Sequence, residues 1–73
     1  MNTITNGSII TTLTGFTLEV KDVKKDVLTC YVLNDNLTRI KEKKINGEYD
    51  FKMAVITRGS IKEVLQTTQG KLF

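Results

Sequence analysis

The sequence predicts an all-β fold, a small barrel of five or six strands, from three observations. Short β-branched or alternating runs recur along the 73 residues, and clusters of turn residues separate them. An Asn46-Gly47 pair between two such runs is the strongest short-range signal for a β-hairpin. Closure of short strands into a barrel removes exposed sheet edges, so a barrel is the natural arrangement for them.

We expect a single domain over residues 1–73, with residues 1–7 and 67–73 as loosely attached tails. Residues 1–7 are polar and end in an Asn-Gly turn. A chain of this size lies near the lower limit for folding alone, which leaves a homo-oligomer open.

Two strands are predicted in the first third of the chain. Residues 8–13 are β-branched, which favours a strand, and Thr14-Gly15 ends it. Residues 16–20 alternate between apolar and polar side chains. This alternation places three apolar side chains inward: Phe16, Leu18 and Val20. The charged residues 22–26 break the alternation, so we expect a loop or bulged turn there.

Residues 27–33 are apolar on both faces, which is typical of a central strand or of one covered by another subunit or segment. Cys30 lies in the middle of this strand, and free cysteine is among the most buried residue types, so we expect a core residue. Residues 34–36 (N-D-N) predict a turn, because Asn and Asp tolerate the left-handed conformation.

Residues 38–56 predict a long hairpin that turns at Asn46-Gly47. A two-residue loop would place Lys41 opposite Lys52 and Lys43 opposite Asp50. Side chains alternate between the two faces of a strand. One face would then hold Ile40, Tyr49, Phe51, Met53 and Val55, and the other Arg39, Lys41, Lys43 and Lys52. We expect the first face to be a core wall and the second a basic surface.

The end of the chain reads as a break, a strand and a tail. Residues 57–60 form the break. Residues 61–66 fit both helical and strand spacing, and we favour a strand. In residues 67–73, Leu72 and Phe73 are able to dock on a partner or on the body of the protein.

Composition bounds the possible functions. The 11 basic and 8 acidic residues give a formal net charge of +3 and a pI of about 9.2, which is compatible with a nucleic-acid partner. Residues 39–44 hold four of the basic residues and one acidic residue, so the excess charge is local. The single cysteine excludes an intrachain disulfide and favours a reducing cytoplasm. We expect no membrane partner, because the apolar runs are short. The Asn-, Lys- and Ile-rich composition fits a bacterial or phage genome.

The residue types argue against an enzyme. The chain has no histidine, so the usual general base at neutral pH is missing. Its carboxylates show no metal-loop spacing, and it has no glycine loop for phosphate. We expect no catalytic residues, no metal site and no cofactor.

The basic face of the hairpin has two interpretations. A row of cations can bind a phosphate backbone, but lysines on an edge strand also block aggregation between sheet edges. Base stacking needs aromatic rings beside the lysines. The predicted register places Tyr49 and Phe51 on the opposite face, which argues against single-strand binding through this surface.

Residues 55–64 (V-I-T-R-G-S-I-K-E-V) resemble the second signature of the Sm-like RNA-binding proteins, chiefly in Ile-Thr-Arg-Gly-Ser-Ile. In that signature an apolar strand runs into Ile-Arg-Gly, and a short polar step leads to another apolar strand. Residues 9–15, 16–22 and 27–33 are similar in outline to the family's first three strands. Thr57 stands where the family usually has isoleucine, and residues 1–7 offer no counterpart to its N-terminal helix.

The resemblance implies a five-stranded bent sheet of the Sm, Tudor or KOW type. It also implies a ring-shaped homo-oligomer joined edge to edge, with single-stranded RNA at its inner loops. Arg58 and Gly59 correspond to binding positions of the family. The same pair also fits an ordinary turn that uses the free φ of glycine.

We therefore expect a non-enzymatic module that binds RNA or DNA through its basic hairpin face. The residues expected to contact nucleic acid are Arg39, Lys41, Lys43, Lys52, Arg58 and Gly59. The alternative is a protein-interaction module, such as a phage- or plasmid-encoded inhibitor or a small assembly subunit, which would use the apolar strand around Tyr31 and Val32. A ligand-sequestering oligomer is a third hypothesis.

Overall fold

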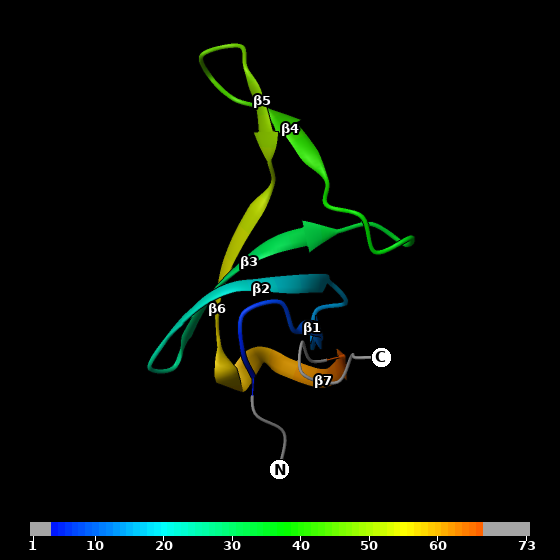
Figure 1. Ribbon diagram of the computed structural model, residues 1–73, viewed down its shortest axis with the longest axis vertical. Coiled ribbons are helices and arrows are strands. Elements are labelled where there is room, and N and C mark those ends of the chain that lie inside the picture. Colours follow the sequence, from blue (N-terminus) through cyan, green and yellow to red (C-terminus); the bar gives the residue numbers. More distant parts are fainter. Residues whose placement is uncertain (1–3, 67–73) are drawn as a thin grey trace.

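The computed structural model describes residues 4–66, which form a five-stranded antiparallel sheet and a separate two-stranded hairpin (Figure 1). The elements are β1 (Ile9–Thr12), β2 (Thr17–Lys24), β3 (Val27–Leu33), β4 (Lys41–Lys43), β5 (Tyr49–Phe51), β6 (Met53–Thr57), the 3-10 turn η1 (Arg58–Ser60) and β7 (Ile61–Gln66). The order across the main sheet is β6-β3-β2-β1-β7, and β4 pairs with β5. The predicted all-β class is confirmed.

The main sheet does not close on itself within residues 4–66. β6 and β7 form its two edges, and no β-bridge joins them. The chain passes from one edge to the other through η1, where the Leu13 N–H donates to the Ser60 carbonyl at 3.0 Å. The five-stranded antiparallel sheet is thus present and a closed barrel is not found, while the Sm, Tudor or KOW type stays a prediction.

The core lies on one face of β1, β2 and β3. Its six buried members are at most 6% exposed: Ile10, Leu18, Val20, Leu28, Cys30 and Val32. They alternate along their strands, and pairing places Leu18 opposite Val32 and Val20 opposite Cys30. Cys30 is fully buried, as predicted. Ala54 and Ile56 of β6 and Ile61 and Val64 of β7 pack against this cluster from both edges.

Two expectations for the first hairpin are wrong. Phe16 is 53% exposed because it precedes β2 in the turn, whereas Leu18 and Val20 are buried as predicted. Residues 22–24 continue β2 after a register irregularity between Val20 and Asp22. The chain turns only at Lys25 and Asp26. Pairing of β2 with β3 and packing of Val23 against the core outweigh the local charge.

The strand predictions for residues 27–33 and 61–66 agree with the structure. β3 spans the predicted residues 27–33 and is hydrogen-bonded on both sides, to β2 and β6. Residues 61–66 form β7, because pairing with β1 decides between helix and strand. In the predicted turn, the Asn34 side-chain oxygen accepts hydrogen bonds from the Asn36 and Thr38 N–H groups at 2.9 and 3.0 Å.

The expected core wall of the long hairpin is wrong, because Tyr49, Met53 and Val55 are 69%, 36% and 66% exposed and Ile40 alone of that face packs against the core.

The predictions for the two ends of the chain are covered only in part. Residues 1–3 and the tail 67–73, including Leu72 and Phe73, lie outside the described residues. Of the polar N-terminal segment, Ile4 packs against the core and the Gly7 N–H donates to the Val20 carbonyl at 2.7 Å. No helix in residues 4–66 has the length and apolar character needed to cross a membrane.

Candidate nucleic-acid interface

The β4–β5 hairpin projects from the sheet (Figure 1), and its loop has three residues where two were predicted. The Lys44 N–H donates to the Glu48 carbonyl at 2.7 Å, and the Gly47 N–H to the Lys44 carbonyl at 2.9 Å. Gly47 has a φ of 91°, and Asn46 is not in the positive-φ region. This is the three-residue hairpin loop in which a turn is followed by a glycine in the left-handed region. The two-residue loop expected at Asn46-Gly47 is therefore wrong.

The extra loop residue shifts the pairing of the hairpin by one position. Lys41 lies opposite Phe51 and Lys43 opposite Tyr49, so the predicted pairs Lys41–Lys52 and Lys43–Asp50 are wrong. A shift of one residue moves every side chain of one strand to the other face relative to its partner. As a result, the aromatic rings and the lysines share one face.

This shared surface, the aromatic–basic face, consists of Tyr31, Arg39, Lys41, Lys43, Tyr49 and Phe51. The Tyr31 and Phe51 rings meet edge to face, with centroids 5.5 Å apart and planes at 78°. The Lys41 ammonium lies 5.5 Å from the Phe51 ring centroid. Tyr49, near the tip of the hairpin, is 69% exposed. The face therefore presents rings and cations side by side, and it joins the hairpin to the outer surface of β3.

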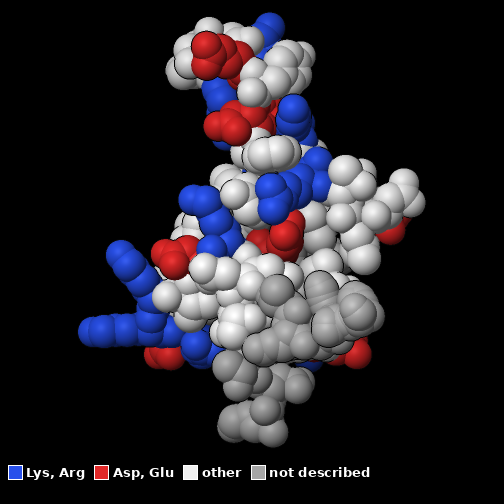
Figure 2. Space-filling model, in the orientation of Figure 1, with Lys and Arg blue, Asp and Glu red and all other residues white. Residues whose placement is uncertain are grey.

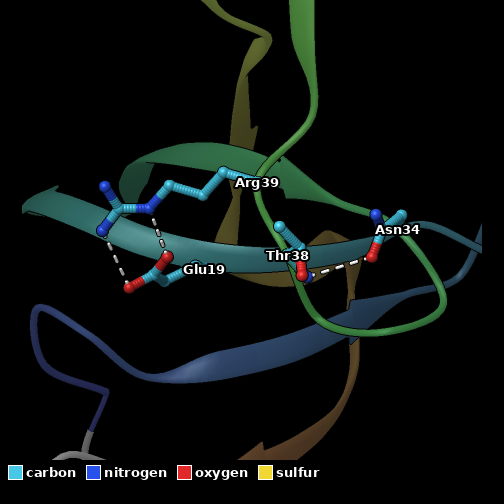
Figure 3. A network of polar contacts seen from close by, with 4 residues as sticks. All are labelled: Glu19, Asn34, Thr38 and Arg39. Atoms are coloured by element: carbon cyan, nitrogen blue, oxygen red, sulfur yellow. Dashed lines mark hydrogen bonds and ion pairs between the residues drawn. The ribbon is translucent and has the colours of Figure 1, made fainter.

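Arg39 connects the hairpin to the sheet (Figure 3). Its Nε and a terminal nitrogen donate to the two Glu19 carboxylate oxygens at 2.7 and 3.2 Å. The guanidinium carbon lies 3.9 Å from the Tyr31 ring centroid, in a stacked position. The hydrogen bond to Glu19 raises the pKa of Arg39 above its usual value. Arg39 is thus a cation whose charge is already balanced.

Lys41 and Lys43 differ from Arg39, because neither has an ion-pair partner in the described part of the chain. Lys44 alternates to the opposite face, where its ammonium contacts the Glu42 carboxylate at 3.0 Å. Residues 39–44 hold four cations. Among the described residues, Lys41 and Lys43 are the two on the aromatic–basic face whose charge is not balanced by an ion pair. The space-filling view shows basic groups on the hairpin and a second group at the β2–β3 turn (Figure 2).

Lys52 does not belong to this face. Its N–H donates to the Ile40 carbonyl at 2.7 Å, and its carbonyl accepts from the Val32 N–H at 2.9 Å. Because Phe51 faces the rings, the next residue points to the other side. There Lys52 lines an apolar pocket beside β6. The prediction that it shares a basic row with Arg39, Lys41 and Lys43 is wrong.

Arg58 and Gly59 lie in η1, beyond the end of β6 that is farther from the hairpin. Arg58 Nε donates to the Lys25 carbonyl at 3.2 Å and lies 3.8 Å from an Asp26 carboxylate oxygen. Gly59 is outside the positive-φ region, so the turn does not use the free φ of glycine. The structure therefore does not bring Arg58 and Gly59 together with the hairpin lysines.

Two observations concern metal-binding groups and the single thiol in the described residues. Residues 4–66 hold no group of three or more histidine, cysteine or acidic side chains that could bind a metal ion. Burial raises the pKa of the Cys30 thiol to about 11, so at neutral pH this thiol is protonated and enclosed by the core.

Sequence reasoning missed four residues of this region: Glu19, Tyr31, Tyr49 and Phe51. The length of the hairpin loop decides on which face Tyr49 and Phe51 lie, so the loop sequence is the signal that could have placed them. A glycine at the third position of a three-residue loop is an established alternative to an Asn-Gly two-residue loop. Glu19 and Tyr31 had no local signal, because their contacts with Arg39 join segments distant in sequence.

Comparison of the chain with protein-family models, with curated proteins and with solved structures finds no match.

Proposed function

We propose that this protein binds single-stranded nucleic acid on the aromatic–basic face. The observation that carries the proposal is the register of the hairpin, which places Lys41 beside Phe51 and Lys43 beside Tyr49. Proteins that bind single strands combine cations for the phosphates with aromatic rings on which bases stack. Both kinds of group lie here on one accessible surface.

Each part of the face has a separate role in this proposal. Tyr49 is exposed and can stack on a base, which contributes about 1–3 kcal/mol in such sites. Lys41 and Lys43 contact the phosphates on either side of it. Arg39 stays bound to Glu19 and presents the Tyr31 ring in a fixed position. A duplex keeps its bases stacked within the helix, so contact with Tyr49 favours a single strand.

The lysine contacts are tested by exchanging Lys41 and Lys43 together for glutamine. Neutralising each phosphate contact on a single strand lowers the slope of log K against log salt by about 0.7, so the double variant should lose about 1.4. Fluorescence anisotropy with short labelled oligo-U and oligo-dT strands over a salt series measures this slope. The matched control exchanges Lys24 and Lys25, at the β2–β3 turn, for glutamine and changes the net charge equally.

The aromatic contact needs its own variant, Tyr49→Leu. The affinity should fall by about fivefold or more while the salt slope is unchanged, because stacking is lost and no cation is removed. Retained affinity in this variant, equal effects of the two lysine pairs, or no binding of either strand by the wild type contradicts the proposal.

The Sm-like resemblance makes RNA the first strand to test and adds Arg58 and Gly59 as a second contact. It also keeps a cytoplasmic homo-oligomer as part of the proposal. In the structure Arg58 is bonded to the β2–β3 turn, so an RNA contact there would replace that bond. If an Arg58→Gln variant binds oligo-U like the wild type, Arg58 is not a contact and this part of the proposal is wrong.

A further inference from the structure

An apolar pocket of about 410 Å³ lies between β6 and the β1–β2 turn, on the core side of the sheet. Its walls include Leu18 and Val32 of the core, Leu13 and Phe16 of the turn, and Ala54 and Ile56 of β6. Leu13 and Phe16 are 68% and 53% exposed. Lys52 also lines the pocket and has no ion-pair partner in residues 4–66. A concave apolar surface with one cation is typical of a binding site.

One edge of this pocket is β6, and the Met53 and Val55 backbone groups have no hydrogen-bond partner among residues 4–66. The Val32 N–H donates to the Lys52 carbonyl, and the Arg58 N–H donates to the Asp26 carbonyl, each at 2.9 Å. These bonds mark residues 52 and 58 as hydrogen-bonded positions toward β3. Hydrogen-bonded and non-bonded positions alternate in an antiparallel pair, and β6 pairs with β3 in a continuous register. The N–H and C=O groups of Met53 and Val55 and the Thr57 N–H therefore point away from β3, whereas the Thr57 C=O belongs to the start of η1.

Within residues 4–66, nothing protects the outer edge of β6 from pairing with another strand. Its five residues, M-A-V-I-T, include no charged residue and no proline, which are the features that usually block pairing at an edge. No other strand in the described part of the chain lies beside this edge. An extended chain added there would gain hydrogen bonds at every second residue.

We propose that β6 binds an extended segment of a partner protein as an additional strand, with apolar side chains at alternate positions and an acidic side chain opposite Lys52. Side chains of the added strand that lie beside Ala54 and Ile56 face the pocket. The acidic group is complementary to Lys52 at the pocket wall. This mode of recognition, strand addition, takes affinity from backbone hydrogen bonds and specificity from alternate side chains.

A second copy of this chain fits the site less well than a free segment. Its other edge strand, β7, could pair with β6, but the inward side chains Ile61 and Val64 already pack against their own core. Such a contact would join the two edges and leave the pocket unfilled. A free segment supplies both the backbone and the side chains that the pocket needs.

The site is separate from the proposed nucleic-acid surface, because Lys52 and the pocket lie on the face opposite Lys41 and Lys43. The test uses a short fluorescein-labelled peptide in which valine alternates with threonine and aspartate ends the sequence. One control peptide has the same composition with its valines adjacent, and another has lysine in place of aspartate. The alternating acidic peptide should bind at least about tenfold more tightly than either control.

The decisive variant is Val55→Pro, which removes an outward N–H and leaves the hydrogen bonds to β3 intact. Peptide affinity should fall by about tenfold or more, whereas Val55→Thr, which keeps the N–H, should bind like the wild type. Lys52→Gln should weaken the acidic peptide by about threefold and leave nucleic-acid binding unchanged. Equal binding of all three peptides, or unchanged binding by Val55→Pro, overturns the proposal.

Hydrogen exchange of the wild-type protein tests the edge without a variant. The N–H groups of Met53, Val55 and Thr57 should exchange rapidly in the free protein and become protected when the peptide is added. Protection in the free protein that is independent of concentration would assign the edge to another segment of the same chain. Protection that rises with protein concentration would assign it to a second copy. Either result overturns the proposal of a partner segment.

Discussion

Exchange of Gly15 for alanine, compared with the same exchange at Gly59, measures how much a positive φ at Gly15 costs in the free energy of unfolding. Gly15 lies in the β1–β2 turn with a φ of 95°, and no atom lies within 4 Å of the position its Cβ would take. Gly59 is not in the positive-φ region, and its Cβ would meet only Thr57 Oγ1 at 4.0 Å. Both positions therefore have space for a methyl group, and they differ in φ.

The magnitude follows from two opposing effects. Alanine restricts the unfolded chain and stabilises the protein by about 0.4–1 kcal/mol where its φ is compatible. A left-handed φ costs an alanine about 1–2 kcal/mol. We expect Gly59→Ala to be slightly stabilising and Gly15→Ala destabilising by up to about 1.5 kcal/mol. The unfolded-state effect is common to both variants, so their difference isolates the strain.

Thermal unfolding followed by circular dichroism checks this prediction. A change of 1 kcal/mol shifts Tm by about 4–8 °C in a domain of this size, so the two variants should differ by at least about 4 °C. Equal midpoints, or a lower midpoint for Gly59→Ala, would refute the reasoning. A stable Gly59→Ala variant is also the correct protein in which to measure RNA affinity, because a loss there would have no folding explanation.

Three further predictions concern the core, the thiol and the Arg39 contact. Leu28→Ala, at a fully buried position, should lower the free energy of unfolding by about 2–5 kcal/mol; a loss no larger than that of exposed Val55→Ala in urea unfolding would contradict the core assignment. Burial raises the pKa of Cys30 from 9.0 to about 11, so the protonated thiol contributes roughly 3 kcal/mol to the free energy of unfolding. This contribution is fully present below about pH 9 and is lost as the pH rises through about 11. Cys30→Ala should remove this pH dependence in urea unfolding, and a constant difference in the free energy of unfolding between the two proteins over that range would exclude it. Glu19→Gln frees the Arg39 guanidinium for phosphate and should increase the magnitude of the oligo-U salt slope by about 0.7. Asp22→Asn makes the same charge change and should leave the slope unaltered. Equal slopes for both variants would show that Arg39 does not contact the oligo-U.

Most of the strand positions could be predicted from local sequence. Residues 27–33 are apolar on both faces and form β3 between two neighbours. Local charge by itself predicts that residues 22–24 lie outside a strand, but pairing with β3 outweighs it. Alternation predicts that Phe16 lies in the core, but β2 begins one residue later. These errors occur where partners distant in sequence decide the outcome.

In the candidate site, too, local sequence decided some features and tertiary contacts decided others. Local sequence determined that a hairpin turns near Gly47, that residues 39–44 concentrate positive charge, and that Cys30 is buried. The tertiary structure decided whether the loop has two or three residues, and both lengths are compatible with the same letters. Neighbouring residues of a strand face opposite sides. The third loop residue therefore places Tyr49 and Phe51 beside Lys41 and Lys43, and it places Lys52 at the pocket. Contacts between distant segments, such as Arg39 with Glu19 and Tyr31, form only when the strands pair, and no local pattern contains them.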